Sequence, residues 1–133
     1  MTREAVGAIA SATILSVAAN LTCVDATKED TLSLAKSWAE LGLRTILALR
    51  GDPPKGTESF VPHPKGFKNS CDMIHALSKV GDFNIRVAGY PHKHPEAESL
   101  EKEVEWLKRK IDACAYTYAA ITQFFCEAED FFR

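Results

Sequence analysis

Arg50, Gly51 and Asp52 follow directly after the apolar run Thr45–Leu49, in the stretch RTILALRGDPPKG. A guanidinium offers a planar fork of N–H donors that suits phosphate oxygens, and glycine lets a ligand approach the backbone closely. The Asp52 carboxylate can accept hydrogen bonds from an amino-substituted heterocycle, or set the charge beside a redox-active ring. A surface turn with an Arg–Asp ion pair is the simpler alternative. Because the three residues end an apolar strand, the order favours a ligand site.

The stretch AGYPHKHPEAES holds a second group of polar side chains. Tyr90 ends another apolar segment and can stack on a flat ring or donate through its hydroxyl. His92 and His94 are two residues apart, a spacing that permits metal binding in a loop. Since no other ligand cluster has a suitable spacing, we expect no metal. One histidine would then be exposed, and the other would hydrogen-bond a ligand or the backbone.

Two further features lie near the C-terminal end of the sequence. Lys108, Arg109 and Lys110 fall in the last part of a predicted helix, where cations complement the helix dipole. A solvated basic face explains them, and a phosphate contact by one or two of them is the functional alternative. Gln123 follows AAIT at a predicted strand end, and its amide can both donate and accept hydrogen bonds.

Apolar segments typical of strands alternate with segments of helical periodicity along the chain. Thr27 is a predicted helix cap with Asp30 as its capping-box partner, and Gly42 is the predicted end of that helix. The predicted strands are Ile14–Leu21, Arg44–Leu49, Phe83–Tyr90 and Tyr118–Phe125, and the predicted helices are Thr2–Ala12, Thr27–Leu41, Ser70–Val80 and Ala97–Ala113, with a last one beginning at Glu127.

This alternation predicts an α/β fold with parallel strands covered by helices. Both a doubly wound sheet and part of a (β/α)8 barrel fit the pattern. No GxGxxG motif follows a strand, which disfavours a dinucleotide-binding Rossmann fold. Polar residues follow several different strands, as at the active face of a barrel; they are Thr22, Cys23, Asp25, Arg50, Gly51, Asp52, Tyr90, His94 and Gln123.

Composition excludes several classes of function. The formal net charge is −2, so no broad face should attract nucleic acid or an anionic membrane. The apolar run near Ala8–Ala19 is too short and too polar to span a bilayer. The start MTREAVGAIASATILSVAAN has an acid in its charged part and no cleavage site, so we interpret it as mature sequence rather than a signal peptide. The four cysteines lack CxxC spacing, which disfavours a zinc site. Reduced thiols in the cytoplasm are therefore expected, and we discount the glycosylation sequon at Asn20.

Five stretches together resemble the methylenetetrahydrofolate reductase family, in that family's order and near its spacing. They are NLTCVDAT, LALRGDPP, VAGYPHKHPEAES, LKRKIDA and ITQFF. The resemblance implies a TIM (β/α)8 barrel that holds FAD at the carboxyl ends of its strands. It also implies an enzyme of one-carbon metabolism and methionine biosynthesis. In this reaction NAD(P)H reduces FAD, and a hydride then passes to 5,10-methylenetetrahydrofolate, which gives 5-methyltetrahydrofolate.

The resemblance implies roles for the residues at matching positions. The implied FAD contacts are Leu49, Arg50, Gly51, Asp52, Ala88, Tyr90, His94, Glu103, Arg109 and Lys110. Glu103 stands where the family usually has Asp. Asp52 is the implied catalytic residue, near both the flavin ring and the folate. Gln123 matches the glutamine that contacts folate and nicotinamide.

Three positions depart from the family's pattern. Asn20 replaces a histidine, and an amide can hydrogen-bond but cannot titrate. Asn69 and Ser70 replace a Tyr-Ala pair. We still expect Asn20 and Ser70 to contact the cofactor. The stretch DACAYTYAA is two residues longer than its family counterpart, and the insertion either shifts Gln123 or only lengthens the turn.

Residues 1–133 match only the central part of the family's barrel, so the sequence predicts a single segment with about four parallel strands. The family's N- and C-terminal strands are missing from this match, together with the proton donor to the folate. Open strand edges would favour self-association. The residues expected on the uncovered interior face are Ile46, Leu47, Val87 and Ile121. A non-catalytic, truncated remnant that associates through its open edges is the alternative function.

Overall fold

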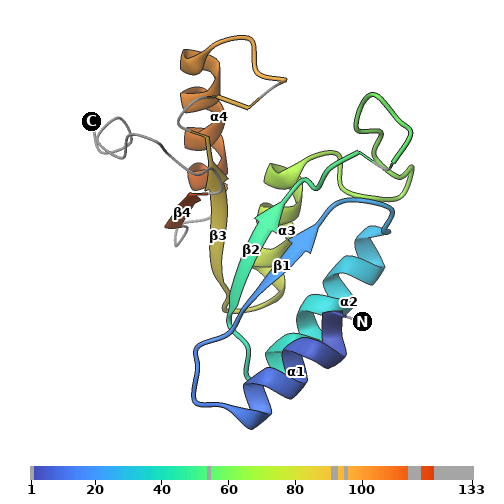
Figure 1. Cartoon of the computed structure of the whole chain (residues 1–133), viewed down its shortest axis with the longest axis vertical. Coiled ribbons are helices and arrows are strands. Elements are labelled where there is room, and N and C mark those ends of the chain that lie inside the picture. The colour runs from blue at the N-terminus through green and yellow to red at the C-terminus, as the bar shows by residue number, and fades with distance from the viewer. Residues whose placement is uncertain (1, 54, 91–92, 95, 114–117, 122–133) are drawn as a thin grey trace.

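A computed structural model describes residues 2–53, 55–90, 93–94, 96–113 and 118–121 of the chain, with side chains described from Glu4 to Ala113 in these ranges (Figure 1). Strands and helices alternate from the first strand onward. The strands are β1 (Ala18–Thr22), β2 (Thr45–Leu49), β3 (Asn84–Gly89) and β4 (Tyr118–Ile121), and the helices are α1 (Thr2–Ala12), α2 (Lys28–Glu40), α3 (Ser70–Val80) and α4 (Leu100–Asp112).

The four strands form one parallel sheet in the order β1-β2-β3-β4. Each strand therefore pairs with the next one along the chain, and α2, α3 and α4 are the crossover connections. A doubly wound sheet reverses its strand order at a switch point. This sheet has no such reversal among its described strands, so the fold is α/β with parallel strands and is consistent with a partial barrel.

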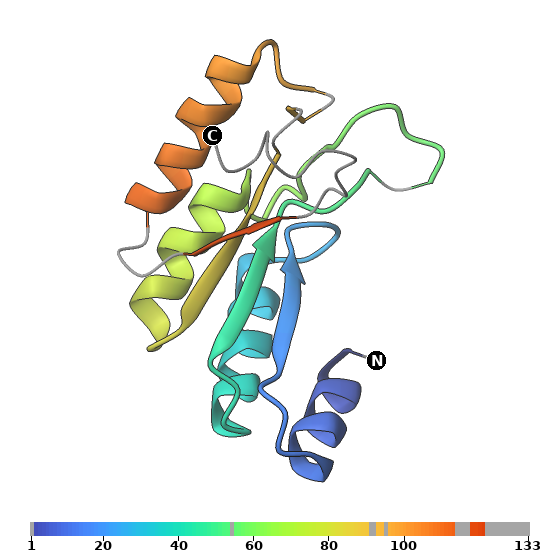
Figure 2. The ribbon, with the colours of Figure 1, turned by 60° about the vertical axis from the view of Figure 1, so that its left-hand side comes forward.

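One face of the sheet packs against helices, and no helix among the described residues packs against the other. On β1, Ala19 and Leu21 are buried while Ala18 and Asn20 are exposed. This period of two follows from the pleat, which points successive side chains to opposite faces. Figure 2 shows α2 and α3 behind the strands, and no described helix covers the face that carries Asn20. We call this second face the open face.

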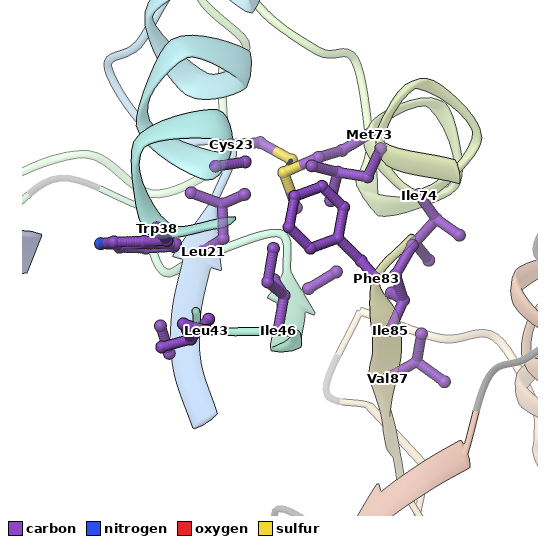
Figure 3. Close-up of a cluster of buried hydrophobic side chains, with 14 of the residues drawn as sticks. Leu21, Cys23, Trp38, Leu43, Ile46, Met73, Ile74, Phe83, Ile85 and Val87 are labelled. Atoms are coloured by element: carbon purple, nitrogen blue, oxygen red, sulfur yellow. Dashed lines mark hydrogen bonds between the residues drawn. The ribbon is translucent and has the colours of Figure 1, made fainter. Parts of the chain in front are cut away.

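The core lies between the sheet and α2 and α3 (Figure 3). Trp38 of α2 and Met73, Ile74 and Leu77 of α3 are fully buried against the strands. Each buried side chain of this size stabilises the fold by about 1.5–3 kcal/mol relative to leaving it in water. The core therefore fixes the sheet on these two helices.

The prediction for the interior face was wrong at two positions. Ile46 and Val87 are 0 % exposed and belong to the helix-covered core. Their positions alternate with Leu47 and Arg86, which lie on the open face. Leu47 is half-buried there, and the side chain of Ile121 lies outside the described residues. The pattern of branched apolar residues does not indicate which face is covered, because a strand in a barrel is apolar on both faces.

Local side-chain chemistry sets the helix ends. Thr27 caps α2, accepting a hydrogen bond of 3.1 Å from the Asp30 N–H. The Asp30 carboxylate accepts from the Thr27 hydroxyl at 2.8 Å, so it supports the cap through the side chain. Gly42 follows the helix with a φ of +85°, as expected for a stop. Asn69 caps α3 by accepting from Asp72 N at 3.0 Å.

Two predicted boundaries differ from the structure by more than one residue. The first strand begins at Ala18, and Ile14 and Leu15 are exposed in the preceding connection. The last helix begins at Leu100 rather than Ala97, because Ser99 accepts a hydrogen bond from the Lys102 N–H and caps it there. The predicted strand residues after Ile121 and the helix from Glu127 lie outside the described residues. None of the described helices has the length and apolar character needed to cross a membrane.

Candidate functional site

A cleft of about 580 Å³ opens at the carboxyl ends of β2 and β3 and is bounded by α4. Pockets of this size accommodate small organic ligands and cofactors. Parallel strands all end at this edge, which brings residues from distant parts of the sequence together. The lining residues are Ala48, Leu49, Arg50, Ser70, Ala88, Tyr90, His94, Glu96, Ala97, Glu98, Lys102, Glu103, Glu105, Trp106, Arg109 and Lys110.

Arg50 extends from the end of β2 and binds Glu96 in a two-point ion pair. Its Nη1 and Nη2 donate to the two carboxylate oxygens at 2.5 and 3.1 Å. The guanidinium also lies 5.1 Å from the ring centroid of Phe60. The hydrogen bond with Glu96 raises the pKa of Arg50 and lowers that of Glu96. Arg50 is therefore a fixed cation at the wall of the cleft.

Lys110 is a buried cation on the α4 side of the cleft. Its side chain is 5 % exposed, and Nζ donates to the Ala88 carbonyl at 3.1 Å. The ammonium lies 5.8 Å from the ring centroid of Tyr90. Burial lowers the pKa of Lys110, and the charge of Glu103 partly opposes this shift. A lysine with a carbonyl and an aromatic ring beside it suits an anionic ligand group, which would compensate its lost hydration.

Glu103 and His94 connect α4 to the segment that follows β3. Glu103 is 6 % exposed, and its Oε2 accepts a hydrogen bond from the His94 backbone N–H at 3.2 Å. The His94 ring packs edge-on against Tyr90 at 4.9 Å between centroids. Glu103 thus positions the histidine and tyrosine that face the cleft. His92 lies outside the described residues, and within them no group of three or more His, Cys, Asp or Glu could hold a metal ion.

The three residues of the basic helix end differ in their surroundings. Lys110 lies within the cleft, as described above. Arg109 is exposed but lines the cleft, and its guanidinium lies 5.8 Å from the ring centroid of Trp106. Lys108 is exposed and does not line the cleft. Two of the three cations therefore lie where a ligand in the cleft could reach them, whereas Lys108 is a solvated helix residue.

Most of the predicted cofactor contacts meet in this cleft. Those that line it are Leu49, Arg50, Ser70, Ala88, Tyr90, His94, Glu103, Arg109 and Lys110. Ser70 is buried as the first residue of α3. Residues from β2, α3, β3 and α4 thus meet at the carboxyl ends of the strands, where the sequence analysis predicted the site.

Three predicted contacts do not line the cleft, and a fourth is not described. Asn20 is exposed on the open face in the middle of β1, whereas the cleft is lined at the ends of β2 and β3, by Leu49 and Ala88 among others. Gly51 and Asp52 lie beyond the cleft lining, and Asp52 is exposed. The charge of Asp52 nevertheless contributes to the raised pKa of Arg50. Gln123 lies outside the described residues.

Seven lining residues were not among the predicted contacts, and two of them, Glu96 and Trp106, have side chains that bear on ligand binding. Glu96 lies within the quoted stretch AGYPHKHPEAES, but its contact with Arg50 spans 46 positions. Trp106 presents a half-buried ring to the cleft, although its spacing on α4 is that of an ordinary amphipathic helix. The sequence feature that could have identified Trp106 is its position three residues before Arg109 on the same helix, which places a large aromatic ring beside a predicted ligand contact.

The fold and the cleft together define a class: a parallel α/β protein with a candidate ligand site at the carboxyl ends of its strands, lined by fixed cations and aromatic rings. The chain belongs to the methylenetetrahydrofolate reductase family, since the family model of that name matches residues 1–133.

Curated relatives agree with this assignment. The 5,10-methylenetetrahydrofolate reductase of Salmonella typhimurium is 40 % identical over 132 residues, which cover 99 % of this chain and 42 % of the relative. The enzyme of the same name from Pectobacterium carotovorum is 42 % identical over 132 residues, with the same coverage of both chains. Methylenetetrahydrofolate reductase (NADH) 1 of Arabidopsis thaliana is 36 % identical over 125 residues, which cover 86 % of this chain and 21 % of the relative. The chain thus spans less than half the length of these relatives.

Proposed function

We propose that this chain contributes the FAD site of an enzyme that uses NAD(P)H to reduce 5,10-methylenetetrahydrofolate to 5-methyltetrahydrofolate. The observation that carries the proposal is the convergence of Arg50, Tyr90 and Lys110 from three separate segments on one cleft. Family membership and the names of the relatives support the reaction. We further propose that the sheet is a segment of a (β/α)8 barrel.

The donor set of the cleft fits a flavin nucleotide. Such a ligand combines flat rings with an anionic diphosphate. Arg50 at the end of β2 and Lys110 on α4 are fixed cations that line the cleft, and the exposed Arg109 lines it as a third. Tyr90 and Trp106 provide flat apolar surfaces. Cation and ring contacts therefore lie within one cavity, as this ligand requires.

FAD, when bound, supplies two-electron hydride chemistry between NAD(P)H and the folate. The residues of this chain bind and orient the ligands. Arg50 and Lys110 donate hydrogen bonds to acceptors of the cofactor, and the buried Ala88, which also lines the cleft, has a small side chain that leaves space beside them. Asp52, beyond the cleft lining, provides the carboxylate that sets the local charge and accepts hydrogen bonds from the folate ring. Gln123 is proposed to contact the folate and the nicotinamide.

Titration of the purified chain with FAD tests this function, with flavin absorbance and fluorescence as the readout. Arg50→Ala should weaken FAD binding because it removes charge-assisted hydrogen bonds worth about 1.5–3 kcal/mol, which is roughly 10- to 150-fold in Kd. Arg44→Ala is the matched control. Arg44 precedes β2 as Arg50 follows it, and its Nη1 donates to the Ala39 carbonyl at 2.9 Å, away from the cleft. Equal affinity of Arg50→Ala and wild type would remove Arg50 from the site, and no FAD binding by the wild type would refute the proposal.

A non-catalytic role through self-association is the second candidate, and the open face favours it. Asn20, Leu47 and Arg86 occupy one register row across three strands on that face. A sheet face with a partly buried leucine, and outer edges of β1 and β4 that no other described strand pairs with, can associate with another copy of the chain. A turnover assay with FAD, NAD(P)H and 5,10-methylenetetrahydrofolate separates the two candidates, because a remnant would associate without turnover.

A further inference from the structure

The Arg50–Glu96 ion pair joins two segments of the cleft wall that are 46 positions apart. Both carboxylate oxygens are engaged, at 2.5 and 3.1 Å. The side chains are 26 % and 49 % exposed, respectively. Ion pairs this accessible to water contribute little to folding stability. The geometry of the pair therefore suggests a role other than holding the fold together.

Glu96 is itself held by contacts on its own segment. Its backbone N–H donates to His94 Nδ1 at 3.2 Å, and the His94 N–H donates to the buried Glu103 at 3.2 Å. Ala97 N–H donates to the His94 carbonyl at 2.9 Å. The Glu96 carboxylate thus stands on a folded unit that is anchored to α4.

The Arg50 guanidinium is restrained from a second direction by Phe60, whose ring centroid lies 5.1 Å away. A guanidinium carries five N–H donors in one plane, and the carboxylate accepts two of them. The orientation of the Arg50 guanidinium is consequently fixed by the Glu96 carboxylate at one edge and by the Phe60 ring beside it. Its other donors then have a defined direction at the cleft wall.

We propose that Glu96 is a positioning residue that orients Arg50, so that the guanidinium presents its remaining N–H groups to hydrogen-bond acceptors of a flavin nucleotide. The ligand class rests on the proposed function, while the orientation of Arg50 does not depend on it. An arginine side chain loses several rotatable degrees of freedom when it binds a ligand. Glu96 imposes part of that order before the ligand arrives, and preorganisation of this kind increases affinity.

The first experiment measures the orientation without any ligand. In the purified chain, the guanidinium NMR signals of Arg50 should show restricted rotation about its terminal C–N bonds. Glu96→Gln should abolish this restriction because an amide cannot form the same two-point ion pair. Glu101→Gln, an equal change at an exposed residue of α4 that does not line the cleft, should leave it intact. An Arg50 signal that is equally restrained in Glu96→Gln would overturn the proposal.

The second experiment measures FAD affinity and thermal stability of the same variants. Glu96→Gln should weaken FAD binding about tenfold and leave the melting temperature little changed. In an Arg50→Met background, the same substitution should weaken FAD binding less than about twofold, because the effects of two coupled residues are not additive. An unchanged Kd, an undiminished effect in that background, or parallel losses of affinity and melting temperature would each overturn the positioning role. If the wild type shows the restrained Arg50 signal but binds no FAD, the proposed function fails while the orientation of Arg50 by Glu96 stands.

Discussion

Gly51 allows β2 to end close beside the segment that follows β1, and replacing it with alanine should be costly. Its φ is +88°, a conformation that costs an L-residue about 1–2 kcal/mol. A Cβ built there would lie 2.5 Å from Val24 Cγ2 and 3.1 Å from Thr22 Cβ, inside van der Waals contact. Overpacking of this kind costs about 1–3 kcal/mol. Together the two effects predict that Gly51→Ala lowers the free energy of unfolding by roughly 2–5 kcal/mol.

Gly42→Ala separates the two effects. Gly42 has nearly the same φ, +85°, but a Cβ there would have nothing within 4 Å. Gly42→Ala should therefore lower the free energy of unfolding only by the cost of the positive φ, about 1–2 kcal/mol. The measurement is urea unfolding followed by tryptophan fluorescence, for which the fully buried Trp38 is a suitable probe. The difference between the two variants is the cost of the close approach.

A double variant provides the second check. Val24→Ala removes Cγ2, the nearest atom, and should restore part of the stability that Gly51→Ala loses. FAD affinity should fall in Gly51→Ala, because Cys23 N–H donates to the Arg50 carbonyl at 3.1 Å and the strain would displace Arg50. If Gly51→Ala were no less stable than Gly42→Ala, the packing of Gly51 against Val24 would be refuted.

Three further predictions concern charge, thiol burial and association. Burial lowers the pKa of Lys110 below its usual 10.5. At pH values between the lowered pKa and 10.5, Lys110 is therefore protonated in the unfolded chain but largely deprotonated in the folded one. Stability should therefore rise with pH through that window, and Lys110→Met should lack this rise in urea unfolding at several pH values. Burial raises the pKa of Cys23 from 9.0 to about 11. Iodoacetamide at pH 8 should therefore leave this thiol unmodified until urea unfolds the chain. Rapid modification of Cys23 in the folded chain, found by peptide mapping, would contradict its burial. The chain should self-associate in light scattering, and Leu47→Glu on the open face should reduce association; a monodisperse wild-type monomer would count against this role.

Features that depend on neighbouring residues were predictable from the sequence. The bounds of α3 agree with the prediction, since Asn69 caps it and the apolar spacing of Met73, Ile74 and Leu77 sets its buried face. Thr27 and Gly42 similarly mark the limits of α2. Caps, stops and strand–helix alternation are decided within a few residues by backbone conformation and hydrogen bonding. The parallel sheet follows from that alternation, because each crossover helix returns the chain to the same edge.

Features that depend on pairing between distant segments were decided by the tertiary structure. The contact of Arg50 with Glu96 spans 46 positions, and that of Lys110 with Ala88 spans 22, so neither has a local signature. Asn20 was expected to contact the cofactor, yet it lies in the middle of β1 on the open face and does not line the cleft at the ends of β2 and β3. Ile46 is buried under the helices because the pleat of β2 points its side chain to the covered face. The residue type determines what a side chain is able to bind, but only the packing of strands and helices determines which groups the side chain faces.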